Sequence, residues 1–206
     1  SFVRAYSLLL GVEAETRLCK LSYERGGFAA EARAAMLTLD TQLERWRATI
    51  ETAFRMHYHV SHAQLGVLTL PHDAFHRYAT LQSIVKDQLG PVIAMRNKLA
   101  HGQWAYQLNA EGDDVAQDMF DIMRKETLFS LEQKRHLARH MAAAIHDLVV
   151  SPPTFAKDFE RHYADFIQTR ARLERVDCAR WEQSLQARHD RGIAKRRQLS
   201  GAGSLG

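Results

Sequence analysis

The stretch from Phe2 to Glu24, FVRAYSLLLGVEAETRLCKLSYE, determines the fold class. Its apolar residues recur at steps of three and four, as they do on one face of an amphipathic helix. They are Tyr6, Leu9, Leu10, Leu18 and Leu21. The adjacent glycines at positions 26 and 27 interrupt this pattern, and glycine commonly ends helices. We therefore expect a first helix over about residues 2–24.

The same periodicity extends along most of the chain, and no segment alternates with the two-residue period of a strand. Further helices are predicted over residues 28–58, from a cap at Asp73 to the break at Gly90-Pro91, and over 91–101, 114–123, 128–150 and 155–186. Residues 60–71, with a short extended piece at most, and 104–113 are predicted connections. The fold class is therefore all-α, a bundle of about six or seven helices.

The firmest break in the sequence is Ser151-Pro152-Pro153. It divides the chain into a helical bundle over 1–150 and a long C-terminal helix over 151–190. This helix is expected to pack on the bundle or on a partner subunit. From residue 191 the sequence is basic (Lys195-Arg196-Arg197) and then rich in Gly and Ser, so 191–206 is predicted to be a disordered tail.

Composition excludes several classes of protein. The 206 residues are 46% hydrophobic and 25% charged, with a net charge of +4, which is typical of a globular chain. The longest uncharged run, residues 56–72, contains four histidines and a proline, so no membrane span is predicted. No secretory leader is recognisable, and Cys19 and Cys178 have no metal or redox spacing. We expect a cytoplasmic protein.

Arginine makes up 21 of the 28 basic residues. Its planar guanidinium group suits phosphate recognition, which favours a nucleic-acid partner. A genome rich in G and C would produce the same excess through its codons, and both explanations remain open.

The heptapeptide Arg96-Asn97-Lys98-Leu99-Ala100-His101-Gly102 is the first candidate site. Its Arg-x4-His spacing is not selective, because chance supplies about one such pair in this composition and Arg135 and His140 form another. Within a helix the two side chains of such a pair lie about 140° apart. They come closer only where the helix ends, or where a second subunit adds its own pair. Gly102 predicts such an end after His101, whereas the helix continues beyond His140.

The Arg-Asn-x-x-x-His segment resembles the catalytic motif of HEPN (higher eukaryotes and prokaryotes nucleotide-binding) domains. Residues 6–18, YSLLLGVEAETRL, are similar to the opening helix of some defence-associated members. The resemblance covers roughly residues 1–150. It implies a dimeric, metal-independent endoribonuclease, often a toxin or antiphage effector, with Arg96 and His101 of two protomers in one cleft.

The chemistry of these residues agrees with that implication. Histidine exchanges protons near neutral pH, so His101 suits the 2′-hydroxyl proton of RNA. Arg96 suits the charge that develops on the phosphate, and Asn97 is placed to orient the imidazole. The products would have a 2′,3′-cyclic phosphate and a 5′-hydroxyl. Neighbouring residues that we expect to contact substrate are Lys98, Gln103, Trp104 and Tyr106.

One position departs from the family. HEPN toxins that pair with nucleotidyltransferase antitoxins have a tyrosine two residues after the histidine, and residue 103 is Gln here. We therefore do not expect regulation by AMP transfer. The resemblance still implies RNA, a second copy of the chain and an antitoxin or defence-system protein as partners.

Two groups of histidines are candidate metal ligands. The first comprises His57, His59, His62, His72 and His76. The second comprises His136, His140 and His146 with Asp147. His136 and His140 share a helix face, but spacing supplies no third ligand. We therefore expect neither a metal nor a cofactor.

Three functions remain open at this point. The leading prediction is the HEPN-type ribonuclease. The alternative is a catalytically inactive HEPN-like dimer that binds RNA, a nucleotide or a protein. A metal-dependent hydrolase that uses the histidines ranks below both.

Overall fold

The computed structural model describes residues 2–61, 63–109, 112–175 and 178–202, and within these ranges the chain is helical without strands. It confirms the all-α class. The described residues form nine α-helices and one π-helical turn. In chain order these are α1 (Phe2–Ser22), α2 (Ala30–Leu37), α3 (Gln42–Tyr58), α4 (His72–Ile84), η1 (Val85–Leu89), α5 (Gly90–Ala100), α6 (Gln117–Lys125), α7 (Leu128–Val150), α8 (Pro152–Arg175) and α9 (Cys178–Ala202).

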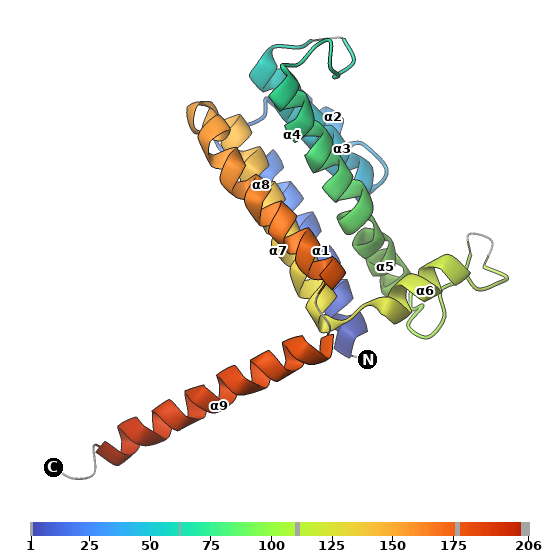
Figure 1. Ribbon diagram of the computed structural model, residues 1–206. Helices are drawn as coiled ribbons and strands as arrows, with labels where there is room; N and C mark the ends of the chain where they lie inside the picture. Colours follow the sequence, from blue (N-terminus) through green and yellow to red (C-terminus); the bar gives the residue numbers. More distant parts are fainter. Residues whose placement is uncertain (1, 62, 110–111, 176–177, 203–206) are drawn as a thin grey trace.

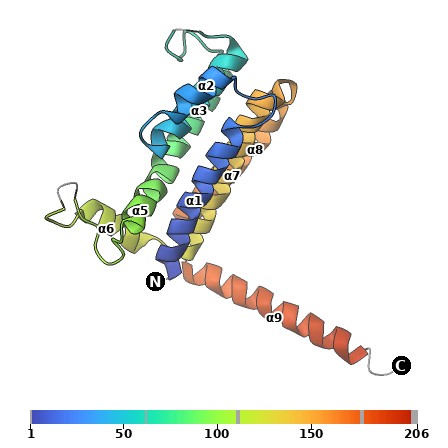
Figure 2. The ribbon, with the colours of Figure 1, turned by 180° about the vertical axis from the view of Figure 1, so that it is seen from behind.

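The long helices lie side by side in two groups (Figure 1). In one group α7 packs between α1 and α8. The other contains α3 and the rod formed by α4, η1 and α5, and α2 covers the end of α3 (Figure 2). The groups meet where α1 contacts α5 and where α7 contacts α3. The bundle therefore places α1 and α5, which the sequence separates widely, against each other.

The hydrophobic core lies between the two groups. Its centre includes Trp46, Ile50 and Phe54 of α3, all fully buried. Phe155 and Phe159 of α8 are 1% exposed and belong to the same core. Burying one such side chain stabilises the fold by about 1.5–3 kcal/mol. Consequently α8 packs on the bundle through aromatic residues of its inner face.

Residues 28–58, predicted as one helix, form two. The second begins at Thr41, whose hydroxyl accepts a hydrogen bond from the Glu44 amide while the Glu44 carboxylate accepts one from the Thr41 amide. This capping box satisfies amides that would otherwise lack partners at a helix start. The prediction of a single helix was wrong because the Thr-x-x-Glu signal outweighs the continuous apolar pattern.

The prediction of a helix break at Gly90-Pro91 is also wrong. The helix passes through these residues by widening into the π turn Val85–Leu89, and the Gly90 amide donates to the carbonyl of Val85, five residues earlier. Pro91 has no amide hydrogen, and in a regular helix its ring would press on the carbonyl four residues before it. A π turn changes this pairing locally, so α4, η1 and α5 form one rod.

Other boundaries differ less. Asp73 makes no capping bond, because the N-cap residue of α4 is Pro71. The helix predicted over 114–123 is observed at Gln117–Lys125, whereas α7 has the predicted bounds.

The C-terminal region is not the single helix over 155–186 that the sequence predicted. α8 ends at Arg175, and α9 extends from Cys178 through residues 191–202, where we expected a disordered tail. α9 leaves the bundle at an angle (Figure 1) and contacts it near its start, where the rings of Trp181 and Phe129 lie 5.4 Å apart.

Candidate active site

The candidate site lies where α1 crosses α5. A Cβ atom on Gly11 of α1 would lie 2.4 Å from Cβ of Arg96 on α5, a distance that real side chains do not reach. Gly11 is therefore required for the close approach of these helices. The crossing brings the Arg96 side chain directly onto α1.

Arg96 is held there by an acidic residue of α1. Its Nη2 atom donates to Glu15 Oε2 at 2.6 Å, and its Nη1 atom donates to Asn97 Oδ1 at 3.0 Å. The Nε atom is buried without a hydrogen-bond partner in the described structure. The Arg96 side chain is still 29% exposed. The guanidinium group is thus fixed in place and accessible from solvent.

His101 lies at the end of the same helix. Its amide donates to the Asn97 carbonyl at 3.1 Å, and Gly102 follows with a φ of +80°, which favours glycine. The imidazole is exposed and has no hydrogen bond, ion pair or ring contact with any residue that the structure describes. Asn97, expected to orient this ring, accepts a hydrogen bond from Arg96 instead. The His101 imidazole is therefore free among the described residues and lies five positions after Arg96 in the chain.

Lys98 and Gln103, predicted to contact substrate, hold the segment after α5 in place. Lys98 Nζ donates to the carbonyl of Leu108. Gln103 Oε1 accepts from the Leu108 amide at 2.8 Å, and its carbonyl accepts from Gln107 Nε2 at 3.0 Å. Both side chains are engaged within the protein, which leaves them a positioning role.

Trp104 and Tyr106, the other predicted substrate contacts, lie in the same segment. Their side chains are 38% and 63% exposed. The Trp104 carbonyl accepts a hydrogen bond from Arg4 of α1, and the Tyr106 ring stacks on Phe120 with centroids 6.2 Å apart. Two aromatic rings are thus exposed within five residues of His101 in sequence, and that of Tyr106 is held by Phe120, an arrangement that suits base stacking.

The second arginine–histidine pair has separate partners. Arg135 donates to Glu13 of α1 at 2.8 Å and to Glu132 at 3.4 Å. His140 points elsewhere, to Asp165 of α8 at 3.3 Å. Although burial opposes it, hydrogen bonding from Arg17 and Arg135 holds the pKa of Glu13 below its usual value. Arg135 and His140 therefore do not converge on a common ligand.

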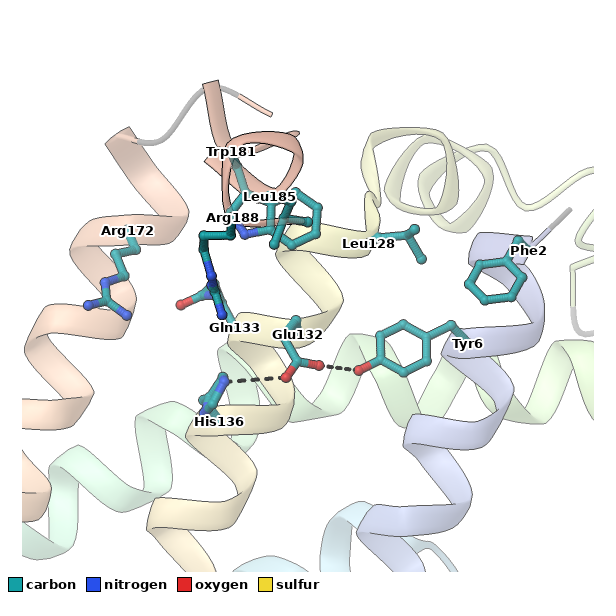
Figure 3. A pocket seen from close by; sticks show the side chains of 10 residues that line it. All are labelled: Phe2, Tyr6, Leu128, Glu132, Gln133, His136, Arg172, Trp181, Leu185 and Arg188. Atoms are coloured by element: carbon teal, nitrogen blue, oxygen red, sulfur yellow. Dashed lines mark hydrogen bonds and ion pairs between the residues drawn. The ribbon is translucent and has the colours of Figure 1, made fainter. Parts of the chain in front are cut away.

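Glu132 has two further partners beside a hollow of about 620 Å³ (Figure 3). The Tyr6 hydroxyl donates to it, and His136 Nε2 lies 3.3 Å away. Burial and the Glu132 carboxylate raise the pKa of Tyr6 to about 12. Arg172 and Arg188 line the hollow, and Trp181 comes from α9.

The first histidine group does not form a metal site among the described residues. His57 packs edge-on against Tyr58 and Phe155, His72 is exposed beside Asp73, and His76 contacts the Tyr163 hydroxyl. His59 ends α3 in a left-handed conformation. His62 lies outside the described residues.

Several residues at these sites had no signal in the sequence. Gly11 and Glu15 lie more than 80 residues from Arg96, and no local spacing links them. No local spacing links His162 and Asp165 to His140 either, and they meet it because α8 packs against α7.

Comparison with protein-family models, with curated proteins and with solved structures finds no match to this chain. None of the helices in the described ranges has the length and apolar character needed to cross a membrane.

Proposed function

We propose that this chain is a metal-independent endoribonuclease whose active site contains Arg96 and His101. The observation that supports this most is the end of α5. There an arginine fixed by Glu15 and an exposed histidine without a side-chain partner among the described residues lie five residues apart, and two exposed aromatic residues follow within five residues in the sequence. The resemblance of residues 96–102 to the HEPN motif supports the same chemistry.

The proposed reaction uses only the RNA and these side chains. Neutral His101 takes the proton of a 2′-hydroxyl, whose oxygen forms a bond to the adjacent phosphorus. The bond from phosphorus to the 5′-oxygen breaks, and a protonated histidine supplies the proton that this oxygen takes up. Arg96 stabilises the charge on the phosphate in the transition state. The two products end in a 2′,3′-cyclic phosphate and a 5′-hydroxyl.

One histidine cannot be base and acid in the same step, which supports a dimer. Residues 2, 5, 9, 12, 16, 19 and 23 form a three–four stripe along one face of α1. Within it Phe2, Leu9, Val12 and Tyr23 are 76%, 63%, 43% and 64% exposed. Glu15, the partner of Arg96, is on the same helix. A second copy packed on this stripe would bring a second His101 toward the site.

The test is cleavage of a labelled RNA pool in EDTA by the wild type and by Arg96→Ala and His101→Ala. Removing one proton-transfer group should lower the rate about 10²–10⁴-fold. Products of the wild type should have cyclic phosphate ends, and DNA of the same sequence should remain intact. His136→Ala is the matched control, since it removes a half-exposed histidine of α7.

The alternative function is RNA binding without cleavage. This alternative is favoured as much as the nuclease is by the exposed Trp104 and Tyr106 and by the excess of arginine. In that case no variant cuts, and RNA affinity falls steeply with salt in the wild type and in both alanine variants. Equal cutting by wild type and His101→Ala contradicts the proposed site.

A further inference from the structure

A second cluster of chemically active side chains lies between α7 and α8, apart from Arg96 and His101. It consists of His140 on α7 with His162 and Asp165 on α8. Each offers one ligand atom, and the three atoms lie within 4.8 Å of one another. Two imidazoles and a carboxylate form a ligand set that zinc accepts in proteins.

The spacing of the ligand atoms suits a small tetrahedral ion. His140 Nδ1 and Asp165 Oδ2 are 3.3 Å apart. With zinc–ligand bonds of about 2.0–2.1 Å, neighbouring ligands of a tetrahedron are about 3.3 Å apart. His162 and Asp165 are one turn apart on α8, so both can face α7. The other two separations among the ligand atoms are at most 4.8 Å.

His162 provides an independent indication of a ligand. Its side chain is 6% exposed, and its Nε2 atom lies 3.2 Å from Asp147 Oδ2. Its Nδ1 atom is buried and has no hydrogen-bond partner in the described structure. Leaving a buried polar atom unpaired costs about 1–3 kcal/mol. A metal ion bound at Nδ1 would remove this cost.

The role of Asp147 fits the same explanation. Histidines that bind metals usually donate their other ring N–H to a carboxylate, which fixes the tautomer and the orientation of the ring. Asp147 occupies this position relative to His162. The arrangement therefore offers three side chains that can bind the ion directly and a carboxylate, Asp147, that orients the most buried of them, His162.

We propose that His140, His162 and Asp165 bind one zinc ion that fixes α8 on α7. Water completes the tetrahedron, since the His140 and Asp165 side chains are 32% and 37% exposed and open the site to solvent. Spacing along α7 alone suggests His136 as the companion of His140. In the structure His136 pairs with Glu132 instead.

The proposal is independent of the ribonuclease chemistry. The zinc ligands include neither Arg96 nor His101, and they come from other helices. The ion is expected to stabilise the fold, while RNA cleavage continues in EDTA. A failure of zinc binding and a failure of cleavage are therefore separate results.

The experiment is a zinc titration of the full, untagged chain after dialysis against EDTA, followed by calorimetry and by thermal unfolding. One zinc per chain is expected, with a rise in Tm of about 5 °C at a zinc concentration 100-fold above Kd. Cobalt in place of zinc should give the visible absorption of a tetrahedral site.

The half-exposed ligands provide variants that should fold. Asp165→Asn and His140→Asn should each weaken zinc binding about 100-fold, which at the same zinc concentration reduces the Tm rise to about 1 °C. Asp147→Asn should weaken it about 10-fold, as expected for an orienting carboxylate. His136→Asn should bind zinc like the wild type. No zinc binding at micromolar concentration, or equal binding by wild type, Asp165→Asn and His140→Asn, overturns the proposal.

Discussion

Two segments of this chain have the same Arg-x4-His spacing, and the structure gives them different surroundings. Arg96 and Arg135 are alike, because each pairs with a glutamate of α1, Glu15 and Glu13 respectively. The histidines differ. His101 ends α5 and is free among the described residues, whereas His140 lies in the middle of α7 and pairs with Asp165. The two segments are thus distinguished by the position of the helix end and not by the spacing of their residues.

The two arginines also differ in the number of carboxylates that each guanidinium group pairs with. Arg135 has two carboxylate partners, Glu13 and Glu132, and hydrogen bonding to Glu13 raises its pKa above the usual value. Arg96 has one carboxylate and one amide partner. A phosphate therefore competes with one ion pair at Arg96 and with two at Arg135.

The largest expected effect separates the two arginines by activity. Arg96→Lys keeps the charge but loses the planar fork that binds phosphate, so the cleavage rate should fall about 100-fold. Arg135→Lys should leave it within about twofold. Rates are measured on one RNA under single-turnover conditions. A comparable loss in both variants would show that the two segments work together.

The second prediction concerns the close crossing of α1 and α5, where Gly11 lies against Arg96. Gly11→Val places side-chain atoms against Cβ of Arg96 and should destabilise the fold by about 3 kcal/mol. Gly192→Ala is the matched control, because a Cβ atom there meets nothing within 4 Å. Urea unfolding measures both. Equal stability of Gly11→Val and the wild type would contradict the close approach of α1 and α5.

The third prediction concerns the second copy that the proposed ribonuclease mechanism requires. Leu9→Glu adds a charge to the exposed stripe of α1, so it should weaken self-association at least about tenfold and lower cleavage in parallel. Leu68→Glu changes a leucine that is 96% exposed in the loop after α3 and should alter neither. Light scattering over a concentration series measures the oligomeric state. Unchanged mass for Leu9→Glu would exclude this face.

The smallest expected effect is a pH dependence of stability at Tyr6, which donates a hydrogen bond to Glu132, a partner of Arg135. Because burial and Glu132 raise the pKa of Tyr6 to about 12, the protonated phenol contributes stability that is complete below pH 10. This contribution is lost as the pH rises from 10 through 12. Burial also raises the pKa of Tyr58 and of Tyr78. Ultraviolet titration should therefore show several tyrosines that ionise late, and Tyr6→Phe should show one fewer than the wild type. An equal number in the two proteins would contradict the raised pKa of Tyr6.

Local signals predicted the helices better than their breaks. The bounds of α7 follow from periodicity, and the end of α5 shortly before Gly102 follows from the glycine. The capping box at Thr41 was visible in the sequence and was outweighed by the apolar pattern around it. Pro91 predicted a break because a proline inside a helix normally costs a hydrogen bond, and only the structure shows the π turn that accommodates it.

The candidate site was predictable only where its residues are neighbours in the chain. Arg96, Asn97 and His101 lie within one short segment, so the motif was recognisable. Glu15 reaches Arg96 only because Gly11 allows two helices to cross closely. Contacts of this kind depend on tertiary packing, and a single sequence contains no record of them.

The π turn at Val85–Leu89 also sets the phase of the helix that follows it. A π turn amounts to an α-helix with one extra residue, and one residue corresponds to about 100° of rotation. Residues after the turn therefore face directions that a regular continuation of α4 would not give them. Removing one residue from this turn would rotate α5 about its own axis and move Arg96 away from Glu15. The length of a segment that contains no candidate catalytic residue thus determines which way α5, and with it Arg96, faces.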